Sequence, residues 1–347
     1  MACLANSDCG SGGTCNASGA CVCSARFNGP RCEFQVFRGI GKLSGDNRSF
    51  VSDISRDGSV VVGGSYLSGG DGHAVRFVSG ALLSIAEPAS VPSSNSCSAR
   101  GIDASGTVVV NCGGVPFLYS LANGAVAVDL SAIGGGSVFD VSLDGKVLVG
   151  QSSSWEAFRK VGSSITQPGG LIPGGSSTPY ATNGDGSVWV GEADVGGGRG
   201  AVRWTANVGL VPLPTLAPTP NDVSESAKDV STDGKVIVGS AHLSVPSSAN
   251  YAVKWSGAPL SLTVLGPGQA NCTNGSGSVI AGLDVNANAT IWDSAGVART
   301  VKALLGATPD LTGWTLTEVR GISDDGKFVA GNGVHDGQDE GWVAHLP

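Results

Sequence analysis

The chain has 347 residues, a formal net charge of −8, 14% charged residues and 55 glycines. Because a glycine inside a helix costs about 1 kcal/mol relative to alanine, this composition excludes a mainly helical protein. The 20 lysines and arginines are too few for the basic surface that nucleic-acid binding requires. The sequence contains no run of about 18 apolar residues, so it predicts no membrane-spanning segment.

The N-terminal segment is rich in cysteine, with most cysteines separated by five residues: Cys3, Cys9, Cys15, Cys21, Cys23 and Cys32. Zinc sites favour cysteine pairs two to four residues apart, so this spacing favours disulfides over a metal. Short Gly- and Ser-rich segments lack the apolar surface for a core and depend on such bonds. We therefore expect a disulfide-rich module over residues 1–35 and an extracellular or cell-surface protein, although the spacing leaves the pairing open.

The end of this segment reads Cys21-Val-Cys23-Ser-Ala-Arg-Phe27-Asn-Gly29-Pro-Arg-Cys32. It resembles an EGF-like module, including the aromatic residue and the glycine that precede the last cysteine. The resemblance implies three disulfides: Cys3–Cys15, Cys9–Cys21 and Cys23–Cys32.

Residues 36–347 contain a repeat about every 45 residues, in which a tight turn precedes a β-branched run that ends in glycine. An Asp-Gly pair supplies the positive φ that a hairpin turn needs, and the Val-rich run is typical of a strand buried on both faces. The turn glycines are Gly58, Gly106, Gly145, Gly186, Gly234, Gly277 and Gly326. A repeat of this length predicts an all-β fold, a seven-bladed β-propeller of four-stranded blades.

The last repeat ends at its third strand, an Ala-Val-Arg-Trp type strand near Trp342. We expect residues 37–43 to supply its missing fourth strand, which would join the two ends of the ring and place the N-terminal module on its rim. The copies, with the pattern Ile-Ser-x-Asp-Gly-x-Val-Val-Val-Gly, resemble the HAF repeats of bacterial extracellular proteins. This resemblance implies a structural signature and no catalytic motif.

The chain has four histidines, none close to another in sequence, and no catalytic or phosphate-binding motif. We expect no catalytic residues, no cofactor and no resident metal. The turn aspartates are interpreted as turn chemistry, and the Arg and Trp side chains of the third strands as packing between blades.

One loop combines carboxylates with an imidazole, which suits a cation such as calcium, although a solvated loop is the favoured interpretation: His335, Asp336, Asp339 and Glu340. The predicted strand order places this loop on one ring face with Asp71, His73, Asp194, Arg199 and His242, and with the connection at 212–226. We treat these residues as the candidate binding face.

Cys97 and Cys112 flank one hairpin at opposed positions, which predicts a fourth disulfide. Cys272 is then unpaired, either buried and inert or bridged to another molecule. Five Asn-x-Ser/Thr sequons are glycosylation candidates: Asn16, Asn47, Asn271, Asn274 and Asn288. The Ser-, Thr- and Pro-rich stretch 213–226 is a further candidate for O-linked sugars.

Two rigid modules, few charges and no catalytic motif favour a non-enzymatic extracellular structural or adhesive protein. In this hypothesis the EGF-like module of one copy docks on the propeller of the next, giving a head-to-tail surface fibre. The alternatives are a glycan- or receptor-binding propeller, or a carbohydrate-active enzyme with two carboxylates facing one cleft. The expected partners are the protein itself or an extracellular glycan or protein, and not nucleic acid.

Overall fold

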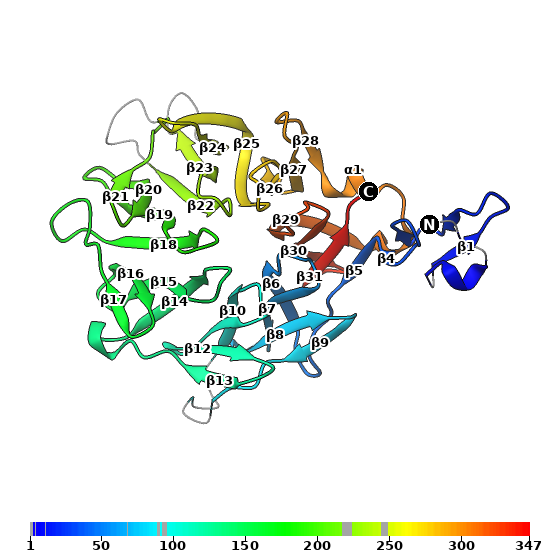
Figure 1. Cartoon of the computed structure of the whole chain (residues 1–347), viewed down its shortest axis with the longest axis horizontal. Coiled ribbons are helices and arrows are strands. Elements are labelled where there is room, and N and C mark those ends of the chain that lie inside the picture. Colours follow the sequence, from blue (N-terminus) through cyan, green and yellow to red (C-terminus); the bar gives the residue numbers. More distant parts are fainter. Residues whose placement is uncertain are drawn as a thin grey trace.

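The computed structural model describes residues 3, 5–10, 12–67, 69–88, 91, 96–216, 224–243 and 249–347. The strands form antiparallel sheets that radiate from a common centre, as in a β-propeller, and a small module projects at one side (Figure 1). None of the helices in these ranges has the length and hydrophobicity to cross a lipid bilayer.

The projecting module consists of η1 (Asn6–Asp8), β1 (Gly13–Cys15), β2 (Cys21–Cys23), β3 (Phe27–Asn28) and β4 (Phe34–Gln35). Strand β1 pairs with β2, and β3 pairs with β4. Disulfides join the pairs that the EGF-like resemblance implies: Cys3–Cys15, Cys9–Cys21 and Cys23–Cys32. These bonds replace the apolar core that a module of this size cannot build.

Four propeller sheets contain four strands that are consecutive in the chain. The first sheet contains β6 (Arg48–Ile54), β7 (Val60–Tyr66), β8 (Gly72–Val78) and β9 (Ala81–Ser84), and the second contains β10 (Cys97–Ile102), β11 (Val108–Cys112), β12 (Val115–Ser120) and β13 (Gly124–Ala127). The third sheet contains β14 (Gly136–Val141), β15 (Val147–Ser152), β16 (Ala157–Val161) and β17 (Ser164–Thr166). The fourth contains β18 (Ser177–Thr182), β19 (Val188–Asp194), β20 (Arg199–Thr205) and β21 (Gly209–Pro212).

The next sheet has seven strands: β22 (Glu225–Val230), β23 (Ile237–Leu243), β24 (Ala249–Ser256), β25 (Ser261–Thr273), β26 (Ile280–Asp284), β27 (Ala289–Trp292) and β28 (Ala298–Thr300). The long strand β25 serves two partners, since Ser261–Pro267 pairs with β24 and Gly268–Thr273 pairs with β26. The short helices are η2 (Ser131–Ile133), α1 (Val301–Leu305) and η4 (Pro309–Leu311).

The last sheet joins the two ends of the propeller segment. It contains β29 (Trp314–Ile322), β30 (Phe328–His335) and β31 (Gln338–His345), and its fourth strand is β5 (Phe37–Gly39), which follows the N-terminal module. Strand β5 pairs antiparallel with β31, with Phe37 opposite Ala344 and Gly39 opposite Trp342. The closing strand therefore comes from within the range 37–43 that the sequence predicts.

The hydrophobic core lies between neighbouring sheets. The Val-rich second strands are buried on both faces, as at Val61 and Val62, which are 2% and 1% exposed. Arginines of the third strands extend over the next sheet: the guanidinium of Arg159 lies 5.5 Å from the Trp204 ring centroid, and its Nε donates to Gly186 O at 2.8 Å. These side chains hold adjacent sheets together.

In six of the seven repeats a glycine ends the β-branched run and faces a β-bulge in the first strand of the same sheet, whereas Asn111 stands at this position in β11. At Gly63 an added Cβ would lie 1.9 Å from Phe50 O, and at Gly239 it would lie 1.9 Å from Ser226 O. The register shifts between Val51 and Asp53 at this level, and again at the same place in the other sheets. The glycine makes room for the bulge, and the bulge re-aims the residues of the first strand at the centre.

Candidate functional site

The turn aspartates are engaged within their own hairpins. Asp57 accepts hydrogen bonds from Ser55 Oγ at 2.6 Å and from Ser59 N at 3.0 Å. Asp144, Asp233 and Asp325 make the same bonds with the serine two residues before them. Bonds from Ser142 and Lys146 lower the pKa of Asp144 to about 2. The turn aspartates are therefore structural, as their interpretation as turn chemistry requires.

Two hairpins carry serine in place of the turn aspartate, and there the acceptor moves two residues upstream. Asp103 accepts from Ser105 N and Thr107 N, both at 2.8 Å. Asn274 accepts from Ser278 N at 2.9 Å and Val279 N at 3.0 Å.

The hairpin role of Asn274 corrects one predicted modification site. Its side-chain amide donates to Asp324 O at 3.1 Å, and the residue is 3% exposed. A glycan on Asn274 is incompatible with this packing, so the sequon is not a glycosylation site in the folded chain. Asn16 and Asn47 are exposed, whereas Asn271 and Asn288 are half-buried, so these four stay candidates.

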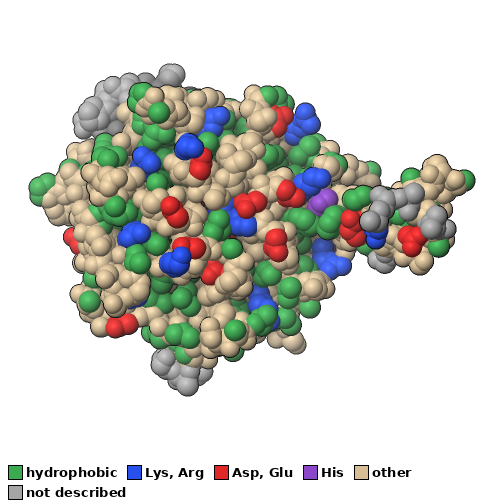
Figure 2. Space-filling view, in the orientation of Figure 1, with side chains coloured by type: hydrophobic (Ala, Val, Ile, Leu, Met, Phe, Trp, Pro, Cys, Tyr) green, Lys and Arg blue, Asp and Glu red, His purple; other side chains and the backbone are tan. Residues whose placement is uncertain are grey.

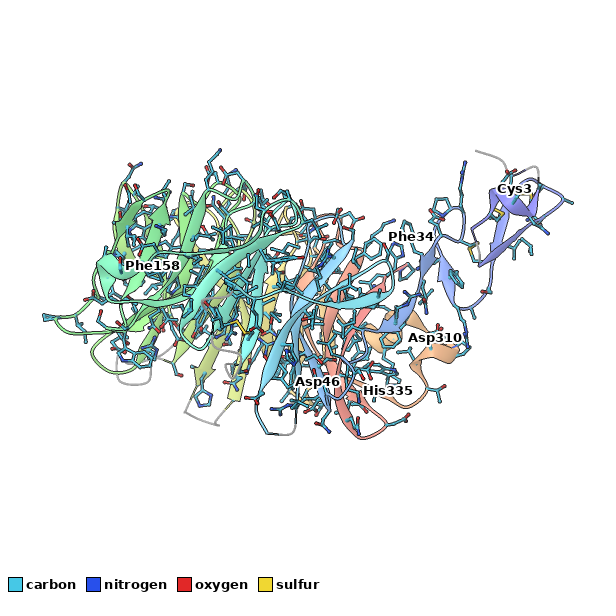
Figure 3. The ribbon with its side chains drawn as sticks, turned by 90° about the horizontal axis from the view of Figure 1, so that it is seen from below. Cys3, Phe34, Asp46, Phe158, Asp310 and His335 are labelled. Carbon is cyan, nitrogen blue, oxygen red and sulfur yellow. A yellow bond between two sulfur atoms is a disulfide. The ribbon has the colours of Figure 1, made fainter. Side chains whose placement is uncertain are left out.

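His335 lies on the same side of the ring as Asp46, far from the tip of the module at Cys3 (Figure 3). Its ring stacks on Trp314 with centroids 4.5 Å apart, and its Nδ1 lies 3.1 Å from Glu340 Oε2. Glu340 is 9% exposed and also accepts Gly41 N at 3.1 Å. These contacts secure the β30–β31 hairpin against the segment that follows β5.

The cation interpretation of this loop is not supported. Among the described residues, the sets of Cys, His, Asp and Glu that converge closely enough to hold a metal are Cys3, Cys9 and Cys21, and Glu87, Cys97 and Cys112. The cysteines of both sets form disulfides, including Cys97–Cys112, so neither set offers thiolate ligands. The ligand atoms of His335, Asp336, Asp339 and Glu340 do not converge in this way.

The other residues of the candidate binding face form local contacts within single sheets. Arg199 donates through Nε to Glu192 at 2.7 Å and through Nη1 to Asp194 at 3.0 Å, which pins the β19–β20 hairpin. His242 Nδ1 lies 3.0 Å from Asn250 Oδ1 across β23 and β24. Asp71 and His73 lie at the β7–β8 connection. Within the connection 212–226 and the O-glycan stretch 213–226, residues 217–223 lie outside the described ranges.

A central channel lies where the first strands of the sheets converge, with a volume of ≈ 800 Å³. Eight charged side chains line it: Asp53, Arg56, Arg100, Asp140, Lys228, Asp229, Glu318 and Arg320. Aromatic rings line it as well, at Phe50, Tyr66, Phe139 and Tyr180. Figure 2 shows acidic and basic side chains interspersed around the centre of one face of the molecule.

Three channel aspartates connect neighbouring sheets. Asp140 accepts Val141 N at 2.8 Å within its own strand and Thr182 N at 2.8 Å on β18. Asp53 and Asp229 make equivalent bonds to Ile102 N at 3.3 Å and to Thr273 N at 2.8 Å. Small residues stand at the matching position of the accepting sheets, namely Gly101, Ala181 and Cys272.

The channel aspartates are surrounded by protein, and this burial changes their pKa values. Burial raises the pKa of Asp53 to about 8, and the charge of Asp140 adds to this rise. Burial raises the pKa of Asp140 to about 7 and also raises that of Asp229. The charge of Arg56 acts on all three aspartates and opposes these rises. Cys272 is a buried free thiol whose pKa burial raises well above its ordinary value, which leaves it unreactive.

Sequence reasoning placed the candidate site on loops and missed the channel. A signal was present, because Asp53, Asp140 and Asp229 each stand four residues before a turn aspartate in alternate repeats. Asp53, Asp140 and Asp229 lie on the strand that precedes each turn, whereas the turn aspartates lie on the hairpins.

The second half of the module is fixed to the propeller through a compact joint. Phe34 stacks on His345 with ring centroids 4.4 Å apart and meets Phe328 edge-on at 5.3 Å. Asn28 Nδ2 donates to His345 O at 3.0 Å, and Arg26 Nε lies 3.3 Å from Asp310 Oδ1. The joint combines apolar, hydrogen-bonded and charged contacts, so it fixes the direction of the module.

No protein-family model matches the chain, and no curated protein matches it. Solved structures do match it. An oligogalacturonate lyase in complex with manganese has a TM-score of 0.58 at 12% identity and covers 90% of this chain and 96% of its own. Kuenenia stuttgartiensis hydrazine synthase has a TM-score of 0.56 at 15% identity, covering 88% and 97%.

A third match is the β-propeller domain of Cps50 (Swd1) from Myceliophteria thermophila, with a TM-score of 0.53 at 10% identity, covering 88% of this chain and 98% of that one. At these identities the similarity shows the fold and nothing of the activity. The chain has an all-β, propeller-like fold with a disulfide-rich N-terminal module.

Proposed function

We propose that this chain is a non-enzymatic extracellular structural protein that assembles head to tail. In this arrangement the N-terminal module of one copy binds the propeller of the next copy. A contact between two different surfaces leaves both ends of the assembly open, and it propagates into a fibre when the rotation between copies does not close a ring. The observation that carries the proposal is a rigid module that projects beyond the propeller rim (Figures 1 and 3).

The projecting half of the module is stiff and available for a partner. Ser24 N donates to Gly12 O at 2.8 Å, and a Cβ on Gly13 would lie 2.5 Å from Cys32 Sγ. The projecting half of the module is therefore in close contact with the half that is joined to the propeller. In the described part of the chain, the hydrogen bonds of residues 12–25 stay within the module. A stiff arm binds with little loss of conformational entropy.

The surface of this arm suits a protein partner. Asp8 is the one charged side chain in residues 1–25, so docking the arm requires little desolvation of charge. Val22 on β2 is 51% exposed, between two disulfide-bonded cysteines that fix its position. An exposed apolar side chain held by disulfides is a good anchor for an interface.

The finer structural assignments belong to the same proposal. We assign residues 1–35 to an EGF-like module, which the three disulfide pairs support, and residues 36–347 to a propeller of HAF-type repeats. Counting β25 as the last strand of one blade and the first of the next gives seven blades. Four disulfides support an extracellular location.

The test is electron microscopy and analytical ultracentrifugation of the native secreted protein over a rising concentration series. We expect filaments from the unmodified protein and single particles from Val22→Asp, which places a charge in the contact. Val22→Thr has the same shape without a charge and serves as the matched control, in which filaments persist.

Single particles of the unmodified protein at every concentration would refute the assembly. If Val22→Asp formed the same filaments as Val22→Thr, the Val22 surface of the module would not be part of the contact between copies. A polysaccharide-cleavage assay tests the non-enzymatic part of the proposal, and activity that Asp140→Asn abolishes would overturn it.

A further inference from the structure

We propose that the central channel binds an acidic sugar, a uronic acid oligosaccharide, through Arg100, Lys228 and Arg320. This inference rests on the channel and is independent of the assembly through the module. The three cations stand at the same position of the first strand in their sheets, one residue before Gly101, Asp229 and Gly321. With Arg56 they give the cavity four cations beside its four carboxylates, whereas the whole chain carries a net charge of −8.

Two of these cations have no carboxylate partner among the described residues. The Nζ atom of Lys228 lies 4.1 Å from the Tyr180 ring centroid, a cation–π contact, and forms no ion pair. Arg100 is exposed to the channel and has neither a hydrogen bond nor an ion pair. Arg320 is paired with Glu318 at 2.9 Å. Lys228 is half-buried and Arg100 is exposed to the channel, so both cations can pair with an anion that enters it.

The nearby aspartates do not neutralise these cations. The two carboxylate oxygens of Asp229 accept Val230 N at 2.7 Å and Thr273 N at 2.8 Å. Arg56 is the cation whose charge acts on Asp53, Asp140 and Asp229. The channel thus has an acidic layer that Arg56 and backbone N–H groups stabilise. Beside it lies a cationic layer in which Glu318 pairs with Arg320, whereas Arg100 and Lys228 form no ion pair with a described carboxylate.

The electrostatic environment of Lys228 supports this assignment. Burial lowers the pKa of Lys228, and the charges of Arg320 and Arg199 lower it further, whereas Glu192 opposes the change. A bound carboxylate would supply the missing negative charge and stabilise the ammonium form.

The neutral part of the lining suits a sugar. Phe139 and Tyr180 lie beside the cations, at the same strand position in their own sheets, and their faces can contact the C–H surface of a pyranose ring. Asn271 and Ser52 occupy the same strand position in their sheets, and their polar groups can hydrogen-bond to the hydroxyls of the sugar. A volume of ≈ 800 Å³ falls within the range of about 300–1,000 Å³ that small-ligand sites have.

The experiment is isothermal titration calorimetry of the full chain at low ionic strength with trigalacturonic acid. Its fully methyl-esterified form has the same sugar rings without the charge. We expect the acid to bind at least tenfold more tightly than the ester, and we expect added salt to weaken its binding. Arg100→Gln and Lys228→Gln, singly and together, should each weaken binding of the acid about tenfold or more.

The matched controls are Lys146→Gln and Lys235→Gln, whose side chains are 74% and 80% exposed on the first hairpins of their sheets and do not line the channel. They remove the same charge outside the channel and should leave binding of the acid unchanged. Because Arg100 is exposed and makes no bonds, Arg100→Gln keeps the test valid even if Lys228→Gln unfolds. Equal binding of acid and ester, no binding of the acid at millimolar concentration, or equal binding by channel and control variants would each overturn the proposal.

Discussion

Asp140 and Asp144 lie four residues apart on one hairpin and have opposite environments. Asp140 faces the channel, where burial raises its pKa from 3.8 to about 7. Asp144 lies on the exposed turn, where Ser142 and Lys146 lower its pKa to about 2. The residue type is the same, so the difference comes from position, and the two side chains contribute to stability in different pH ranges.

The folded-state pKa of Asp140 exceeds its ordinary value, so its stabilising contribution is complete below about pH 4 and is lost as the pH rises toward 7. We expect the free energy of unfolding to fall between pH 4.5 and pH 8 in the unmodified protein. Asp140→Asn should remove part of this fall and leave the part that comes from Asp53 and Asp229. Urea denaturation at the two pH values measures the difference.

Asp144→Asn is the control for this prediction. The pKa of Asp144 is lowered, so its contribution is present above about pH 4 and is lost only as the pH falls toward 2. This variant should show the same fall between pH 4.5 and pH 8 as the unmodified protein. A fall in Asp140→Asn that equals that of Asp144→Asn would contradict the assignment.

Asn274 is a second residue whose structural role in its hairpin depends on burial. Asn274→Ala removes a buried amide that accepts Ser278 N and Val279 N and donates to Asp324 O, so it should destabilise the protein by about 1–3 kcal/mol. Asn47→Ala changes an exposed sequon residue and should cost less than about 0.5 kcal/mol. Equal urea midpoints for the two variants would show that the hairpin does not need Asn274.

At the scale of the element, the sequence predicts the first hairpin of each sheet well. The turn glycines that mark the repeat have positive φ, as at Gly58 with 75° and Gly145 with 72°, so the local chemistry of Asp-Gly is sufficient. The continuous strand β25 was not foreseeable, since it depends on how two successive sheets meet around Gly266 and Gly268. The repeat places Asp53, Asp140 and Asp229 at equivalent positions, but the contacts that each makes with the next sheet depend on how sheets more than forty residues apart in the chain pack together.

Strand β5 is the element on which the joining of the two ends depends. Phe37 is fully buried and contacts Trp314 and Trp342, with ring centroids 5.1 Å and 6.1 Å away. Phe37→Ala leaves a cavity between these rings and should destabilise the propeller by about 3–5 kcal/mol. Arg38→Ala, the next residue, removes a half-exposed side chain and should cost less than about 1 kcal/mol. Thermal unfolding of the two variants at equal midpoints would show that β5 adds little.

At the scale of the whole molecule, the joint between module and propeller decides whether the chain is one rigid body. Residues from both ends of the sequence meet there, with Asn28 and Phe34 against Phe328 and His345. No local pattern predicts these contacts, because they join residues more than 290 positions apart in the sequence. The sequence could place the module on the rim, but it could not show that the direction of the module is fixed.

Phe34→Ala should release the module without unfolding either part. The substitution removes the stacking on His345 and the edge contact with Phe328, while the three disulfides keep the module folded. In small-angle X-ray scattering at low concentration, the unmodified protein should fit one rigid shape, whereas Phe34→Ala should require an ensemble of module positions. Trp155→Ala, at a 68% exposed aromatic residue of the propeller, is the control and should scatter like the unmodified protein. If Phe34→Ala and Trp155→Ala gave identical profiles, Phe34 would not be the residue that fixes the module, and a fibre built on its fixed direction would lose its physical basis.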